Sequence, residues 1–224
     1  MKINKIKDGL KHHIVDSTAL LAESTPVFAA FEVGLAGMSD EVSLNARLFA
    51  AGLTYFGGMG YFYGKGRDLY RKALHITDKT KERKQTIHDA IYTGLFNLIA
   101  APIIYVGAGS RDIKEIAIGT ASAVAFGAIN GAPLGYSVDL FRDLTGLKEC
   151  GRPSYPKLLK KQNSKIKKSL AVLAVAASVA LTAGIYALTP DKEIKTNQEP
   201  FRELIASEIK KENLEEKTLH LNIK

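Results

Sequence analysis

Charged side chains inside apolar stretches are the part of this sequence that could do chemistry, because an ionisable group in such a place is costly and is often functional. Glu23 and Glu32 interrupt the first apolar stretch, and Arg47 stands near the start of the second. A carboxylate can bind a proton or an ammonium group, and an arginine can bind a carboxylate. Because only a short turn separates Glu32 from Arg47, we predict an ion pair or a shared hydrogen bond between them. The alternative is that both side chains extend to the nearest water.

A second group of charges gathers near the ends of the apolar stretches. Two of its acids, Asp68 and Asp139, stand near helix carboxyl ends, where a negative charge opposes the helix dipole, so each needs a partner. Arg71 and Arg142, each three residues further on, face the right way to supply one. The whole group comprises Asp16, Arg67, Asp68, Arg71, Asp89, Asp139 and Arg142.

Two of these acids, Asp16 and Asp89, open the first and third predicted helices, where an acid is favourable as a cap. Two hypotheses follow for the group: it only finishes helix ends, or it forms a cytoplasmic gate or vestibule that binds a zwitterion. An amino acid offers one ammonium group and one carboxylate, so a site with both acids and arginines suits it. Asn97 and Asn130, inside the third and fourth helices, either contact a substrate or link helices.

The elements that must hold these groups are five apolar blocks, at about 15–36, 44–63, 90–108, 116–137 and 169–189. A helix that crosses a bilayer needs about 20 mostly apolar residues. Buried helices of a soluble protein normally carry a polar face, whereas the second to fifth blocks are apolar or small on all sides. The sequence therefore predicts an all-α integral membrane protein, with four transmembrane helices in two hairpins and a fifth transmembrane helix.

The basic residues predict the orientation, because Lys and Arg accumulate in cytoplasmic loops. Four precede the first block, eight lie in residues 64–86 and nine in residues 138–168. We therefore expect a protein of the cell's inner membrane whose amino terminus and two long loops are cytoplasmic. The polar tail 190–224 is expected outside. The net charge of +8 is explained by this topology, so no nucleic-acid partner is expected.

The two hairpins look like an internal repeat, over residues about 12–72 and 86–143. At a fixed offset of 71, five identities align: Gly60 with Gly131, Gly64 with Gly135, Asp68 with Asp139, Leu69 with Leu140 and Arg71 with Arg142. A duplicated unit with an even number of spans keeps its orientation. The halves would then be related by a pseudo-two-fold axis along the membrane normal, as in parallel-repeat transporters.

Small residues form a stripe along the fourth block and a shorter one at the end of the second. Such stripes let two helices approach closely. We predict either that the second and fourth helices pack together at the centre, or that the stripes receive a homodimer partner. The packing glycines are Gly60, Gly64, Gly119, Gly127, Gly131 and Gly135.

Three runs, "HHIVDSTALLAESTPVFAAFEVGLAGMSDEVSLNARL", "YGKGRDLYRK" and "GAPLGYSVDLFRDL", together resemble the bacterial L-alanine exporter family over about residues 12–145. The matching positions are His13, Asp16, Glu32, Gly37, Met38, Ser39, Arg47, Leu48, Gly64, Arg67, Asp68, Leu69, Gly135, Tyr136 and Asp139. The resemblance implies an exporter of L-alanine or a similar small neutral amino acid, driven by the proton gradient. The chain departs from the family pattern in its fifth helix, its tail and Glu23, which has no acidic counterpart there.

The sequence thus divides into a four-helix transport unit (1–145), a basic cytoplasmic linker (146–168), the fifth helix (169–189) and the polar tail (190–224). The alternative function is a non-transporting membrane scaffold or assembly protein acting through the fifth helix and tail. The exporter hypothesis expects residues 1–145 to keep much of the function, and the scaffold hypothesis does not.

An enzyme is not expected, because no nucleophile–base motif, phosphate loop or dinucleotide fingerprint occurs, and no histidine spacing suggests a metal. We therefore expect no catalytic residue, cofactor or metal. The expected partners are a small amino acid and the lipid bilayer. A homodimer is also expected, because four helices enclose little volume.

Overall fold

The computed structural model describes residues 2–35, 39–107, 111 and 113–189, and every regular element in that part is a helix. The chain order is α1 (Lys2–Ala29), the π-helical turn η1 (Ala30–Leu35), α2 (Asp40–Tyr55), α3 (Met59–Ala73), α4 (Glu82–Gly107), α5 (Ile113–Leu144), α6 (Lys157–Lys160) and α7 (Ser164–Leu188). The predicted polar tail 190–224 and the motif residues Gly37 and Met38 lie outside the described residues.

Four helical stretches within this part are long and apolar enough to cross a membrane: residues 6–34, 82–104, 116–144 and 164–188. They contain most of the first, third, fourth and fifth predicted blocks. The all-helical, membrane-spanning class is therefore confirmed. The prediction of five continuous spans is wrong at the second block, which the structure divides between α2 and α3.

The break between α2 and α3 follows from two adjacent glycines. Gly58 has φ 75°, a left-handed conformation that favours glycine. A helix that ends leaves its last carbonyls without internal partners, and α1 supplies donors for two of them. Ser17 Oγ donates to the Thr54 carbonyl at 3.2 Å, and His13 Nε2 donates to the Tyr55 carbonyl at 2.7 Å. The broken helix is thus held in place by α1.

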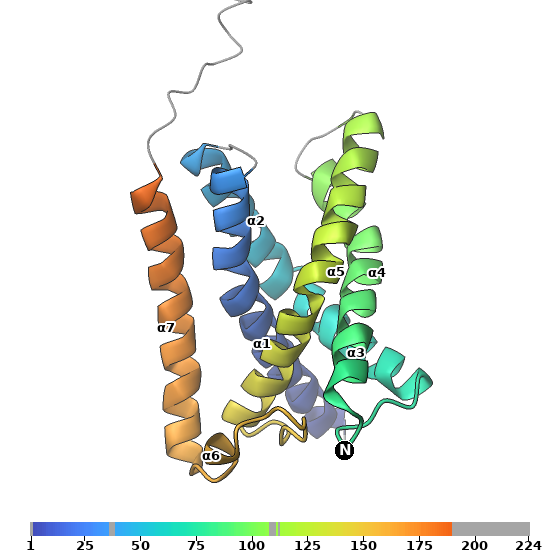
Figure 1. Cartoon of the computed structure of the whole chain (residues 1–224), viewed down its shortest axis with the longest axis vertical. Coiled ribbons are helices and arrows are strands. Elements are labelled where there is room, and N and C mark those ends of the chain that lie inside the picture. The colour runs from blue at the N-terminus through green and yellow to red at the C-terminus, as the bar shows by residue number, and fades with distance from the viewer. Residues whose placement is uncertain (1, 36–38, 108–110, 112, 190–224) are drawn as a thin grey trace, which may run out of the picture. The chain divides into compact units, whose positions relative to one another are not determined.

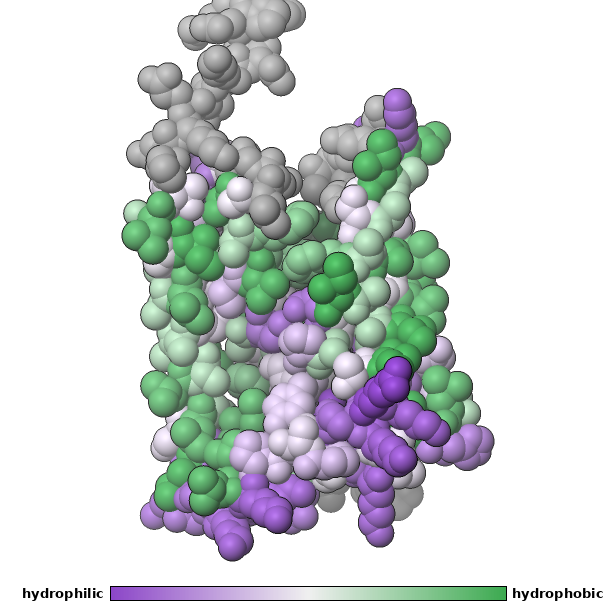
Figure 2. Space-filling view, in the orientation of Figure 1, coloured by the Kyte–Doolittle hydropathy of each residue, from purple (hydrophilic) through white to green (hydrophobic). Residues whose placement is uncertain are grey.

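The helices form a bundle in which α1, α4 and α5 run from one end to the other, while α7 packs along α1 (Figure 1). We call the end that carries residues 74–81 and 145–163 the basic end. We call the opposite end, with η1 and the start of α2, the far end. Hydrophilic residues gather at the basic end, and apolar side chains cover much of the visible helix surface above it (Figure 2). This distribution suits a bundle surrounded by lipid.

The small-residue stripes pack inside each hairpin, not between the hairpins. Gly60 and Gly64 of α3 face Ser17 and Asp16 of α1, and the glycines of α5 face α4. A Cβ atom on Gly131 would stand 2.6 Å from the Asp89 carbonyl oxygen. The predicted packing of the second helix against the fourth is therefore wrong, while the homodimer alternative stays a prediction. The other seam glycines of α5, Gly127 and Gly135, likewise meet α4, while Gly119 lies half-buried on the same helix.

We predict that Gly131→Ala destabilises the folded chain. The new methyl group would meet main-chain atoms of α4, which cannot rotate away, and overpacking of this kind costs about 1–3 kcal/mol. The measurement is the melting temperature of the detergent-solubilised protein. Gly184→Ala on α7 is the matched control, because a Cβ there would meet nothing within 4 Å. Equal melting temperatures for the two variants would contradict this packing.

Candidate functional site

Arg67 is the centre of a buried charge network at the basic end, where α3, α4 and α5 meet. Its guanidinium donates to both carboxylate oxygens of Asp89, at 2.8 and 3.0 Å, and to both of Asp139, at 2.9 and 2.8 Å. The arginine side chain is completely buried, with 0% of its surface exposed. An arginine so enclosed is stable only with such charge-assisted hydrogen bonds, and four of them use both edges of its planar fork.

Arg152, from the segment between α5 and α6, enters the same network, and the sequence analysis missed it. It pairs with Asp89, donates to Asp139 at 2.6 Å and to Glu82 at 2.8 Å, and is only 2% exposed. Burial alone would lower the pKa of the Arg152 guanidinium, but the charges of Asp139 and Asp89 raise it above its ordinary value. No periodic pattern marks Arg152, because it lies in a linker. Only its contact with the network reveals it.

The two predicted arginine partners are exchanged between the hairpins. Arg142 donates to Asp68 at 2.8 Å and holds both oxygens of Asp16 at 2.7 Å, whereas Arg71 donates to Asp139 at 3.0 Å. The predicted pairs within each helix are therefore wrong. The prediction that the Asp68 and Asp139 carboxylates have arginine partners is confirmed.

The cap prediction is wrong for both acids that were expected to open helices. Asp16 lies fourteen residues after the start of α1 at Lys2, and Asp89 lies one to two turns inside α4, which starts at Glu82. Both point into the bundle and are buried. Their role in this structure is to pair with arginines from other helices, not to satisfy a helix end.

At the far end, the predicted ion pair between Glu32 and Arg47 is confirmed, with 2.5 Å between Arg47 Nη2 and Glu32 Oε1. Ser43 Oγ donates to the other carboxylate oxygen at 2.7 Å, and the Tyr186 hydroxyl of α7 lies 3.0 Å from Ser43 Oγ. The guanidinium of Arg47 also lies 4.8 Å from the ring centroid of Phe28. The sequence analysis missed both residues. Only folding brings Tyr186 of α7 to this site, whereas Ser43 lies one turn before Arg47 on α2, and that spacing could have indicated it.

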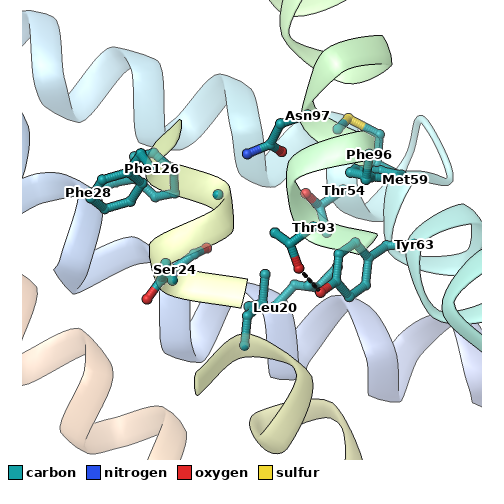
Figure 3. Close-up of a pocket in the computed structure, with 13 residues that line it drawn as sticks. Leu20, Ser24, Phe28, Thr54, Met59, Tyr63, Thr93, Phe96, Asn97 and Phe126 are labelled. Atoms are coloured by element: carbon teal, nitrogen blue, oxygen red, sulfur yellow. Dashed lines mark hydrogen bonds between the residues drawn. The ribbon is translucent and has the colours of Figure 1, made fainter. Parts of the chain in front are cut away.

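Between the two charged ends lies a cavity of about 110 Å³, room for a few water molecules or one small solute. Its wall combines hydroxyl and amide groups with aromatic rings, and Figure 3 shows the Tyr63–Thr93 hydrogen bond on one side and Phe28 close to Phe126 on another. The polar lining residues are Ser24, Thr54, Tyr63, Thr93, Asn97 and Asn130.

The broken helix opens onto this cavity, since Thr54 at the end of α2 and Met59 at the start of α3 both line it. Both predicted asparagines are there too. Asn97 Nδ2 donates to the Ala123 carbonyl at 2.8 Å and so links α4 to α5. Asn130 Nδ2 donates to Glu23 Oε2 at 3.1 Å. The asparagines therefore link helices and face the cavity at once, so the two alternatives are not exclusive.

The described residues include no group of three or more His, Cys, Asp or Glu side chains that could hold a metal ion. The polar groups of the site instead bind one another or face the cavity. Membrane-spanning helices, one helix broken beside a small polar cavity, and buried ion pairs at both ends are features of a small-solute membrane transporter.

The comparison with known proteins agrees with this class. A family model described as "AlaE: L-alanine exporter" matches residues 5–148, and the chain belongs to this family. The L-alanine exporter AlaE of Cronobacter sakazakii is 29% identical over 136 residues, which are 60% of this chain and 83% of that protein. The Escherichia coli K12 protein of the same name is 28% identical over 60% of this chain and 88% of its own length. No solved structure matches the chain significantly.

We predict that Arg142→Gln strongly destabilises the chain, by about 3–5 kcal/mol, because it leaves the buried Asp16 carboxylate without its cation. The decrease in melting temperature of the purified protein measures this. Lys148→Gln is the control, since Lys148 is half-exposed at the same end. Adding Asp16→Asn to Arg142→Gln should recover part of the loss. A double variant no more stable than Arg142→Gln would show that the unpaired Asp16 carboxylate does not cause the loss of stability.

Proposed function

We propose that this chain is a secondary exporter of L-alanine or a similar small neutral amino acid, driven by the proton gradient across the cell membrane. Membership of the L-alanine exporter family supports the transport class. The observation that carries the proposal is the cavity at the α2–α3 break. Hydroxyl and amide groups can donate to a carboxylate and accept from an ammonium group, as a zwitterion requires. The small volume favours a short side chain.

The basic end is proposed to face the cytoplasm, as basic loops of membrane proteins do. The far end, and with it the end of α7, would then face outward. Cargo must in that case enter the cavity from the basic end, where the ion pairs of Arg67 join α3 to α4 and α5. Opening requires separation of these ion pairs, so we propose that the network is the inner gate, and that Glu32 with Arg47 closes the outer side.

A duplicated hairpin offers the means of movement, and matched contacts support this part of the proposal. Gly64 packs on Asp16, and its repeat partner Gly135 packs on Asp89. In the same way Gly60 packs on Ser17, and Gly131 packs on Ala90. Asp89 follows Asp16 by the same number of residues as Ala90 follows Ser17, as expected for a repeat. Two similar units that rock against one another would expose the cavity alternately to either side.

We predict that cells making this protein and loaded with an alanine dipeptide export L-alanine faster than cells with an empty vector. Ser24→Leu should slow export at equal amounts of protein in the membrane, because the larger side chain occupies the cavity. Ser169→Leu is the control, since Ser169 is exposed near the start of α7. If the wild type leaves alanine efflux unchanged, the exporter proposal fails and the scaffold alternative gains support.

We predict that Arg152→Gln loosens the inner gate, and the single cysteine of the chain offers a native probe. Cys150 lies two residues from Arg152, it is buried, and burial raises the pKa of its thiol, so the wild type should react slowly with maleimides. Arg152→Gln should accelerate labelling. Arg83→Gln, an exposed change at the same end, should not.

A membrane-impermeant maleimide also tests the orientation in this experiment. It should label the Arg152→Gln variant in inside-out vesicles and not in right-side-out vesicles. Labelling at the wild-type rate would show that Arg152 does not hold the gate closed. Labelling only in right-side-out vesicles would reverse the proposed topology.

A further inference from the structure

Glu23, a half-buried acid of α1, differs from the buried acids of the bundle because it has no basic partner among the residues that the structure describes. The other acids each have an arginine or lysine within ion-pair distance: Asp16, Glu32, Asp89, Asp139 and Asp143. None of the ion pairs found among the described residues includes Glu23, whose side-chain partner is the neutral amide of Asn130. A carboxylate in an apolar bundle without a cation favours binding either a proton or a cationic ligand.

The helices around Glu23 supply no hidden counter-charge. Residues 116–138 of α5 and residues 169–188 of α7 contain no charged side chain. The next acids along the chain are Asp16 of α1 and Glu32 of η1, and both are already paired. The arginines of the neighbouring elements already have acidic partners: Arg47 pairs with Glu32, Arg67 with Asp89 and Asp139, and Arg142 with Asp16 and Asp68. The tyrosine hydroxyls also have hydrogen-bond partners, which are Thr93 for Tyr63, Thr18 for Tyr55 and Ser43 for Tyr186.

Asn130 connects this acid to the cavity, because its side chain both bonds to Glu23 and lines the cavity wall. An amide has an NH2 donor and a carbonyl acceptor. When Glu23 is charged, it holds the NH2 group and leaves the amide oxygen free to accept a hydrogen bond from an ammonium group. When Glu23 is protonated, its O–H can donate to that oxygen once the amide group has turned over. The NH2 group, which cannot accept a hydrogen bond from an ammonium group, then faces the cavity.

We propose that Glu23, acting through Asn130, makes cargo binding and proton binding mutually exclusive, so that the chain exchanges one amino acid for one proton. Binding of the amino acid's ammonium group at Asn130 displaces the proton of the Glu23 carboxyl to water on the cytoplasmic side. After the cargo leaves on the outer side, Glu23 takes up a proton there and carries it inward. The net cycle is one zwitterion out and one proton in, with every proton accounted for.

This inference rests on the proposed function and names its coupling residue. Competition between two ligands at linked sites is reciprocal, so the proton must weaken cargo binding by the same factor as cargo weakens proton binding. For one displaced proton, the affinity for L-alanine falls about tenfold for each pH unit below the pKa of Glu23. Neither the ion-pair networks nor the cavity alone predicts such a dependence.

The test is calorimetric titration of the purified full-length chain with L-alanine in two buffers of different ionisation enthalpy, which counts the protons released on binding. At a pH below the pKa of Glu23, the wild type should release a proton on binding. Glu23→Gln should bind L-alanine without proton release and with an affinity independent of pH. In liposomes, Glu23→Gln should still exchange labelled L-alanine between the two sides and should lose accumulation driven by a pH gradient. Glu41→Gln, at an exposed acid of α2, should behave as the wild type.

Two outcomes separate the inference from the function it rests on. Wild-type protein that neither binds nor moves L-alanine overturns both. Transport with undiminished proton release in Glu23→Gln overturns the Glu23 assignment alone. If Glu23→Gln does not fold, Asn130→Leu serves instead: it keeps the acid and removes the link, so proton release must be lost there, and its retention refutes the coupling.

Discussion

Neutralisation of buried charge is the constraint on which the rest of this bundle depends. At the basic end, Arg67, Arg71, Arg142 and Arg152 bind four aspartates, Asp16, Asp68, Asp89 and Asp139. Each charge alone would destabilise an apolar interior, and removal of one partner leaves the other charge buried and unpaired. The network therefore ties α1, α3, α4, α5 and the linker together. None of these four helices can leave its place without separating ion pairs.

The glycine stripes leave the space that the carboxylates of the charge network occupy. Gly64 lies where any side chain would collide with Asp16, and Gly135 does the same for Asp89. The absence of side chains at these positions leaves room for the carboxylates between closely packed helices. The stripes are thus part of the geometry of the site. Because Arg71 and Arg142 each bind an aspartate of the other hairpin, neither hairpin neutralises its own buried charges.

Hydropathy predicted most of the fold from the sequence, and a short connection predicted the Glu32–Arg47 pair, because both depend on local composition and length. The errors have a common physical source. The break at Gly58 depends on one backbone angle, which an average over apolar residues does not detect. The exchange of arginine partners depends on tertiary packing, which outweighs the weak preference for a neighbour one turn away. Arg152 lies in a linker, so no periodicity marked it.

Segments of the chain outside the family match contact both ends of the part that the family model matches. Arg152 shares Asp89 and Asp139 with Arg67, and Tyr186 of α7 bonds to the serine that holds Glu32. Removing them would leave a buried site short of one cation at the basic end and of one hydroxyl at the far end. The expectation that residues 1–145 keep much of the function assumes that this part balances its own buried charges. In this chain, Arg152 from outside that part helps to balance the charges of Asp89 and Asp139.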